Sequence, residues 1–300
     1  MGLTLKCASL FGGFVTHPIL TWATERLSAG RQVAMATVLS ASGSVPGKPG
    51  ARIALTNLGE VSGTVGGAGL EMQVLERLQT MLNGMGGEPG GDVETFQLYR
   101  DAKGDAGIPL DSLCGGRVTV AFEVVHPMPH VLLCGGGHCA QAIASACDNL
   151  EWKHSVFDVR PDYCDENSYP DATELHHSSA GSFIEGEDAG SLARFSDILL
   201  LGHDWAVDEE LLLGLLNARQ ADPDSWRTRI GVIGSRSKWQ AFCKSTVEAG
   251  IEQAFLDDVD CPIGLNIGAE SPSEIAVAVT AQLISRIKEQ DHESPNWRNA

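Results

Sequence analysis

The stretch HVLLCGGGHCAQAIASACDNLEWKHSVFDVR, residues 130–160, constrains the fold more than any other part of this 300-residue chain. It begins as an apolar run, turns through three glycines, continues as a helix of small residues and returns to an apolar run that ends in Asp158. The spacing Gly135-x-Gly137-x-x-Ala140 fits the dinucleotide-binding pattern. In that pattern the glycines make a tight turn and admit a pyrophosphate at the helix N-terminus, and the acid binds ribose hydroxyls.

We therefore predict a Rossmann-type unit whose nucleotide contacts come from the turn, the first residue of the helix and the acid of the second strand. These residues are Gly135, Gly137, His138, Ala140 and Asp158. Arg160, beside Asp158, leaves the choice between NAD and NADP open, because an arginine at this place can bind a 2′-phosphate. The alternative is that the glycines serve packing only.

Strand and helix patterns alternate beyond this point. The predicted strands are 130–134, 154–158, 196–201 and 229–234, and the predicted helices are 138–149, 206–219, 236–249 and 273–289. Such alternation is typical of a parallel sheet with helices on both faces. The two prolines of HPMP (126–129) mark the boundary with the preceding residues. We expect an N-terminal domain over 1–126, a Rossmann-type domain over 130–290 and a flexible tail over 291–300.

Two further junctions could bring chemistry to the same edge of the sheet. LGHDWAVD (201–208) places His203 and Asp204 after a strand, although a polar loop in which Asp208 caps the next helix explains the pattern equally well. GVIGSRSKW (231–239) offers Gly234 and Ser235 as a turn and N-cap that could hold an anion. Its charges would be Arg236 and Lys238; the alternative is a helix cap with solvated basic residues.

The first 126 residues predict a mixed α/β domain. Its expected strands are 33–39, 51–56, 61–65, 93–99 and 117–125, its helices are 17–28 and 68–82, and 40–50 is expected as a loop. Three glycine-rich stretches stand out: GSVPGKPGARI (43–53), GTVGGAGLE (63–71) and LCGGRVTVAFE (113–123).

Together these stretches describe anion-binding turns beside a reactive thiol. The candidate ligand contacts are Ser44, Gly66, Gly67, Glu71, Cys114 and Gly115. Taken one at a time, each has a structural explanation: glycines for tight turns, Glu71 as a favourable charge at a helix N-terminus, and Cys114 as a buried small residue.

Composition narrows the class of protein. A net charge of −18 argues against binding to nucleic acid or an anionic membrane through bulk electrostatics. No apolar run approaches the roughly 20 residues that cross a bilayer, and the eight cysteines include no C-x-x-C pair. We expect a soluble cytoplasmic protein in which most thiols are buried.

The three glycine-rich stretches, in this order and before GGGH, resemble the xanthine dehydrogenase accessory factor family of XdhC/CoxI-like proteins. The likeness continues through VFDVRPDY, GVIGSRSKWQAF and CPIGLNIGAESPSEIAVAVTAQLI (261–284), so it covers roughly residues 30 to 286. It implies a cofactor-handling N-terminal domain and a C-terminal Rossmann domain. It also implies a chaperone that binds molybdenum cofactor (molybdopterin) and assists its sulfuration, protection or insertion into a xanthine dehydrogenase-type hydroxylase.

The same resemblance implies a molybdenum hydroxylase as client, a cysteine desulfurase as a further candidate partner and a homodimer. Cys114 would be a sulfur contact near molybdenum, since thiolates suit soft metals. The chain departs from the family pattern at Gly47 and Lys48, where an arginine is common, and at Ala68, where a third glycine is common.

In the LGHDW loop, Gly202 and Trp205 replace the more usual threonine and second histidine. This departure weakens any catalytic role for His203. An alternative function is an NAD(P)-dependent oxidoreductase in which His203 or His138 does acid–base work, and a third is a nucleotide-sensing module without chemistry.

Overall fold

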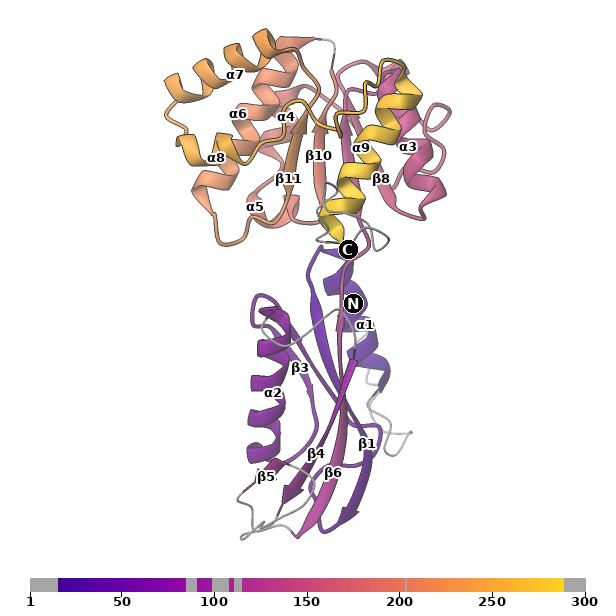
Figure 1. Cartoon of the computed structure of the whole chain (residues 1–300), viewed down its shortest axis with the longest axis vertical. Helices are drawn as coiled ribbons and strands as arrows, with labels where there is room; N and C mark the ends of the chain where they lie inside the picture. Colours follow the sequence, from indigo (N-terminus) through magenta and orange to yellow (C-terminus); the bar gives the residue numbers. More distant parts are fainter. Residues whose placement is uncertain (1–15, 85–90, 99–107, 111–114, 203, 289–300) are drawn as a thin grey trace, which may run out of the picture. The chain divides into compact units, whose positions relative to one another are not determined.

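The computed structural model describes residues 16–84, 91–98, 108–110, 115–202 and 204–288. It divides the chain into two compact units, Met1–Pro127 and Met128–Ala300, within the HPMP segment. The first unit has a largely antiparallel sheet with helices, and the second has a parallel Rossmann-type sheet (Figure 1). The predicted fold class is thus confirmed.

The N-terminal unit is a six-stranded sheet with a helix on each face. The strand order is β3-β2-β1-β6-β4-β5, antiparallel except for the β4–β5 pair. The strands are β1 (Val33–Gly43), β2 (Arg52–Thr56), β3 (Val61–Thr64), β4 (Gly91–Leu98), β5 (Ile108–Leu110) and β6 (Gly116–Val125). The helices are α1 (Thr16–Ser28) and α2 (Ala68–Leu82).

The sheet is buried on both faces at β2 and at the start of β1, where the two helices cover it. Leu70, Val74 and Leu78 of α2 pack on one face, and Ile19 and Ala23 of α1 pack on the other. This explains why β1 begins as a continuous apolar run rather than an alternating one.

Strand β1 is longer than the predicted 33–39. It continues through Ser40–Gly43, which pair with residues 116–119 of β6 after a register shift between Val38 and Ser40. The small residues at 40–43 are typical of a loop, and they form a strand here because β6 pairs with them. The expected loop 40–50 therefore begins at Ser44.

The second unit is a parallel five-stranded sheet in the order β11-β10-β7-β8-β9. Its strands are β7 (His130–Cys134), β8 (Lys153–Asp158), β9 (Leu175–His177), β10 (Asp197–Leu200) and β11 (Arg229–Val232). Its helices are α3 (His138–Asn149), α4 (Ala180–Glu185), α5 (Ala189–Leu192), α6 (Trp205–Ala221), α7 (Arg236–Glu248), α8 (Gln253–Asp257) and α9 (Pro272–Ile287), with a 3₁₀ turn η1 (Pro161–Tyr163).

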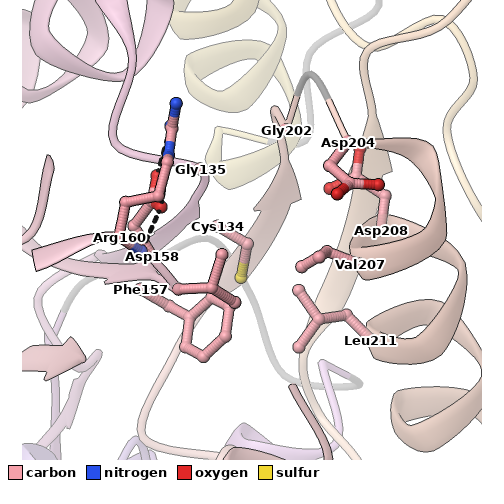
Figure 2. A pocket seen from close by; sticks show the side chains of 11 residues that line it. Cys134, Gly135, Phe157, Asp158, Arg160, Gly202, Asp204, Val207, Asp208 and Leu211 are labelled. Carbon is pink, nitrogen blue, oxygen red and sulfur yellow. Dashed lines mark hydrogen bonds and ion pairs between the residues drawn. The ribbon is translucent and has the colours of Figure 1, made fainter. Parts of the chain in front are cut away.

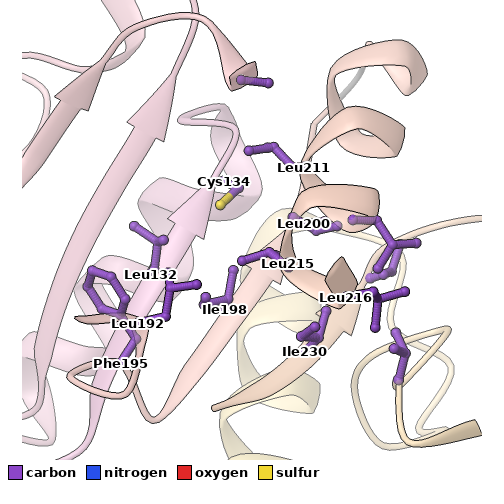
Figure 3. Packing of buried hydrophobic residues seen from close by; sticks show 14 of the residues in the cluster. Leu132, Cys134, Leu192, Phe195, Ile198, Leu200, Leu211, Leu215, Leu216 and Ile230 are labelled. Atoms are coloured by element: carbon purple, nitrogen blue, oxygen red, sulfur yellow. The ribbon is translucent and has the colours of Figure 1, made fainter. Parts of the chain in front are cut away.

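Two apolar layers sandwich this sheet. On one face, side chains of β7 and β10 such as Leu132, Cys134 and Ile198 pack against Leu211 and Leu215 of α6 (Figure 3). On the other face α3 and α9 supply the packing partners. The sequence missed the shortest elements, β5, β9, α4, α5, α8 and η1, because a few residues carry no measurable periodicity.

The strand order creates a switch point between β7 and β10. From β7 the chain adds β8 and β9 on one side, then crosses back to add β10 and β11 on the other. In open α/β sheets, ligands bind in the crevice at the carboxyl ends of the strands at such a point. No described helix is both long and apolar enough to cross a membrane.

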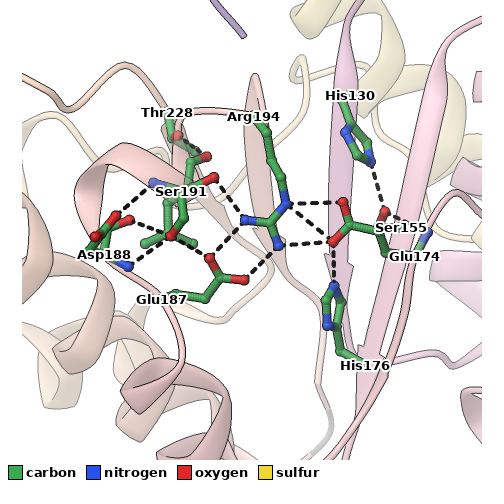
Figure 4. A network of polar contacts seen from close by, with 10 residues as sticks. His130, Ser155, Glu174, His176, Glu187, Asp188, Ser191, Arg194 and Thr228 are labelled. Atoms are coloured by element: carbon green, nitrogen blue, oxygen red, sulfur yellow. Dashed lines mark hydrogen bonds and ion pairs between the residues drawn. The ribbon is translucent and has the colours of Figure 1, made fainter. Parts of the chain in front are cut away.

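A polar network ties β7, β8 and β9 to the segment before β10 (Figure 4). The ring Nε2 of His130 lies 2.7 Å from the hydroxyl of Ser155. Arg194 donates to Glu174 at 2.9 Å and to Glu187 at 2.7 Å. Burial lowers the pKa of His130 to about 4, so the ring is neutral near pH 7. Because His130 and Ser155 are buried, this network holds the sheet together rather than meeting a substrate.

Candidate functional site

Two of the three glycines in the β7–α3 turn are required by close packing. Gly135 has a φ of +105°, and a Cβ there would lie 2.7 Å from the backbone nitrogen of Gly202. A Cβ on Gly136 would lie 1.9 Å from the carbonyl oxygen of Tyr163. The tight turn predicted for Gly135 is therefore present. The need for Gly136 depends on a residue far along the chain and could not be predicted from spacing.

Gly137 differs, because a Cβ built on it meets no atom within 4 Å. It precedes α3 in an extended conformation, and no side chain caps the helix there. The space beside Gly137 is thus open and α3 has no side-chain cap, an arrangement that suits an anion such as a pyrophosphate. His138 is exposed at the first helical position, and Ala140 is fully buried against the sheet.

Asp158 ends β8 with its carboxylate buried; the residue is 3% exposed. It accepts hydrogen bonds from the amides of Gly136 (2.8 Å) and Arg160 (2.9 Å), and from Nε and Nη2 of Arg160 (2.9 and 2.8 Å). Burial alone would raise the pKa of Asp158, but these hydrogen bonds hold it below its usual value. The predicted contact of Asp158 with ribose hydroxyls would need one of these donors to leave.

A small hollow, open to solvent, lies at the carboxyl ends of β7, β8 and β10 (Figure 2). Its wall is apolar on the α6 side, where Phe157 and Cys134 face Val207 and Leu211. Polar groups line the rest: Asp158, Arg160, Asp204 and Asp208. Because it sits at the switch point, this hollow is the candidate ligand site of the second unit.

The α6 junction has a different cap from the one that the alternative interpretation, a polar loop capped by Asp208, gave it. Asp204, rather than Asp208, is the N-cap of α6 and accepts from the amide of Ala206 at 3.0 Å. Asp208 is 1% exposed and pairs with the ammonium of Lys238 at 2.7 Å. Burial raises the pKa of Asp208 even though Lys238 opposes the rise.

The α7 junction is joined to the α6 junction by this ion pair. Ser235 caps α7 as predicted, accepting from the amide of Lys238 at 3.3 Å, and Gly234 stands directly before it. The Lys238 ammonium pairs with Asp208, so it is neither a free charge for an anion site nor the solvated charge of the alternative interpretation. An anion at Gly234 and Ser235 stays a prediction, with Arg236 exposed beside them.

The three glycine-rich stretches of the N-terminal unit meet in space. The amide of Ser44 donates to the carbonyl of Gly115 at 2.8 Å. A Cβ on Gly66 would lie 2.7 Å from the carbonyl oxygen of Pro46, and one on Gly67 would lie 2.5 Å from the Pro46 ring. Chain segments separated by tens of residues thus form one cluster of turns.

Helix α2 begins at this cluster without a side-chain cap. Its N-cap is Gly67, with a φ of +78°, and a Cβ on Gly69 would meet no atom within 4 Å. Thr64 donates to the carboxylate of Glu71 and accepts from the amide of Gly66 at 3.0 Å. A helix start without a side-chain cap can bind an anion through its backbone amides.

Two predicted residues, Cys114 and His203, lie outside the described residues. Across the described ranges, no group of three or more His, Cys, Asp or Glu side chains could hold a metal ion. Burial raises the pKa of Cys147 to about 12 and that of Cys261 to about 11, so these thiols are protonated near pH 7.

These features define a two-unit protein: a sheet with converging glycine turns, followed by a Rossmann unit with a small, solvent-open hollow at its switch point. Residues 131–283 match the XdhC Rossmann domain, and residues 26–96 match the XdhC and CoxI family. The chain belongs to the XdhC and CoxI family, and the resemblance found in its sequence is confirmed.

Two curated relatives are longer than this chain. The uncharacterized protein YqeB of Escherichia coli (strain K12) is 29% identical over 252 residues, which cover 84% of this chain and 43% of that protein. A probable xanthine dehydrogenase subunit of Bacillus subtilis (strain 168) is 24% identical over 174 residues, or 56% of this chain and 46% of that protein. The chain thus spans less than half the length of either relative.

Two solved structures show weaker likeness. A xanthine dehydrogenase from Bacillus halodurans is 18% identical with a TM-score of 0.46, covering 92% of this chain and 97% of that one. The NAD(P)-binding domain of an exopolyphosphatase-related protein from Archaeoglobus fulgidus is 16% identical with a TM-score of 0.31, covering 42% of this chain and 94% of that one.

Proposed function

We propose that this protein binds the molybdenum cofactor and assists its protection, sulfuration or insertion into a hydroxylase of the xanthine dehydrogenase type. Membership of the XdhC and CoxI family supports the role in maturation. The client would be the molybdenum hydroxylase itself, a cysteine desulfurase is a candidate sulfur donor, and the working form would be a homodimer.

The observation that carries the proposal is the meeting of the glycine-rich turns at the uncapped start of α2. The cargo is a pterin that bears a dithiolene and a phosphate, so a carrier needs several backbone amides, close together, that can donate hydrogen bonds to the phosphate. The turns at Ser44, Gly66 and Gly115 bring backbone close together, and α2 adds the positive end of a 15-residue helix. Cys114 directly precedes Gly115 in the sequence and would supply a thiol next to the cargo.

The direct test is transfer of molybdopterin from a loaded donor protein to this chain under anaerobic conditions. Molybdenum content and pterin fluorescence of the re-isolated protein are the two readouts. Uptake of both by the wild-type protein is expected; uptake of neither would count decisively against the proposal.

A charge at the start of α2 gives a sharper version of this test. Gly69→Glu places a carboxylate where the phosphate would bind, and a negative charge at a helix N-terminus does not weaken the fold. We expect uptake to fall at least about tenfold, because two like charges a few ångströms apart repel by more than the 1.4 kcal/mol that corresponds to tenfold. Thr80→Glu, three turns further along α2, is the matched control and should take up cargo normally. Equal uptake by both variants would remove the start of α2 from the site.

A further inference from the structure

Arg160 lies at the rim of the hollow, and part of its guanidinium has no hydrogen-bond acceptor among the described residues. Nε and Nη2 form a side-on pair with the Asp158 carboxylate, at 2.9 and 2.8 Å. No described residue accepts a hydrogen bond from Nη1, and the side chain is 35% exposed. One edge of the planar fork, made of Nη1 and the second hydrogen of Nη2, is therefore free to bind an oxyanion.

The ring of Tyr163 fixes the orientation of this fork. The guanidinium carbon lies 3.7 Å from the centre of the Tyr163 ring, so one face of the cation is covered. The carboxylate of Asp158 fixes one edge as well. Because both constraints hold Arg160 in place before a ligand arrives, little side-chain entropy is lost on binding.

Asp158 has no acceptor site left for a ribose hydroxyl. A carboxylate offers about four lone-pair sites. Four donors already use them: the amide of Gly136, and the amide, Nε and Nη2 of Arg160. A nucleotide with free ribose hydroxyls would have to displace one of these donors from a carboxylate that is 3% exposed. A nucleotide with a phosphate on that ribose needs no such displacement, since the free edge of Arg160 meets it.

The rim of the hollow beside this pair suits the nucleoside end of such a ligand. The hollow is small and open to solvent, so a nucleoside would lie across its mouth rather than inside it. Val159 is exposed and Val207 is half-buried at this rim, and together they offer an apolar surface for a base. The uncapped start of α3 at Gly137, on the same edge of the sheet, is where the pyrophosphate would continue.

We propose that the rim of the hollow between Asp158 and α6 binds the adenosine end of an adenine dinucleotide that carries a 2′-phosphate, with the free edge of Arg160 on that phosphate. The ligand class is NADP(H) rather than NAD(H). This proposal concerns the second unit alone and does not depend on the molybdenum cofactor.

Calorimetry on the full-length protein with two fragments tests the choice directly. 2′,5′-ADP carries the diagnostic phosphate and 5′-AMP lacks it. We expect 2′,5′-ADP to bind about 10- to 100-fold more tightly, the range expected for hydrogen bonds between charged groups. 3′,5′-ADP, the corresponding part of coenzyme A, should bind no better than 5′-AMP. Equal affinity for 2′,5′-ADP and 5′-AMP, tighter binding of 3′,5′-ADP, or no binding of any of the three at millimolar concentration would each overturn the proposal.

Arg160→Ala tests the residue itself. It removes the phosphate contact and frees two acceptor sites on Asp158, so the preference for 2′,5′-ADP over 5′-AMP should disappear. Arg227→Ala is the matched control, because Arg227 is an exposed arginine just before β11, at the opposite edge of the sheet. It should keep the wild-type preference. An Arg160→Ala protein that melts like the wild type and keeps the preference would also overturn the assignment.

Discussion

Breaking the ion pair between Asp208 and Lys238 should strongly destabilise the Rossmann unit, because the Asp208 carboxylate is buried. Lys238→Met keeps the aliphatic stem of the lysine and removes only its ammonium. It leaves the Asp208 carboxylate, in a residue 1% exposed, without the cation that lies 2.7 Å away in the wild-type protein. The pair also joins the α6 and α7 junctions, so its loss should loosen both.

The size of the effect follows from burial. Removing one partner of a buried pair usually costs about 3 to 5 kcal/mol, because the other charge is left without compensation. The lower figure applies here, since the amide of Gly202 still donates to Asp208 and the side chain borders a solvent-open hollow. A loss of about 3 kcal/mol corresponds to a melting temperature lower by roughly 6 to 12 °C for a unit of this size.

The pH dependence gives the effect a signature. Burial already raises the folded-state pKa of Asp208 above its unfolded value, so its favourable contribution holds at acidic pH and is lost as the pH rises. Removing Lys238 raises that pKa further. The difference in stability between wild type and Lys238→Met should therefore be small near about pH 4 and grow toward neutral pH.

Urea unfolding followed by tryptophan fluorescence measures this difference, since Trp152, Trp205 and Trp226 all lie in the second unit. Adding Asp208→Asn to the Lys238→Met protein removes the stranded charge and should recover most of the lost stability. A loss below about 1 kcal/mol, or the same loss at both pH values, would refute the reasoning from burial.

Three other predictions concern separate parts of the chain. Gly136→Ala should destabilise the second unit, because its Cβ would lie 1.9 Å from the Tyr163 carbonyl, whereas Gly137→Ala should melt like the wild type; equal melting temperatures would contradict the packing argument. The folded-state pKa of His130 is about 4, below its unfolded value. Neutral His130 therefore contributes to stability above about pH 6.5, and about 3 kcal/mol of that stability is lost as the pH falls from 6.5 through 4. In a His130→Gln protein, the urea midpoint should lack this decrease at acidic pH. Cys114→Ala should keep the melting temperature and lose most molybdenum uptake, whereas Cys147→Ala, which alters a buried thiol of α3, should not; the same molybdenum content in both would end the case for Cys114.

The sequence determined those features that are local. The glycine spacing at 135–140 and the alternation after residue 130 predict a strand, turn and helix in a parallel sheet, and β7 and α3 have the predicted bounds. Helix α2 also has its predicted bounds, since its apolar stripe and flanking glycines lie within one continuous segment. Turn chemistry and helical periodicity depend on neighbouring residues, so a single sequence is enough to reveal them.

Contacts between distant segments needed the tertiary structure. Gly136 and Gly137 look alike in the sequence, but only Gly136 meets the Tyr163 carbonyl, because η1 folds back over the turn. In the sequence, nothing links Lys238 to a buried acid. In the structure, the pairing of β10 with β11 brings the helix of Lys238 beside Asp208. The sequence also could not show that the acceptor sites of Asp158 are already occupied. Residue spacing places the carboxylate at the end of a strand, but it does not show which donors bond to that carboxylate. Strand order and packing decide which of these distant groups meet. They set the distances between side chains that lie far apart in the sequence, and the sequence alone does not give those distances.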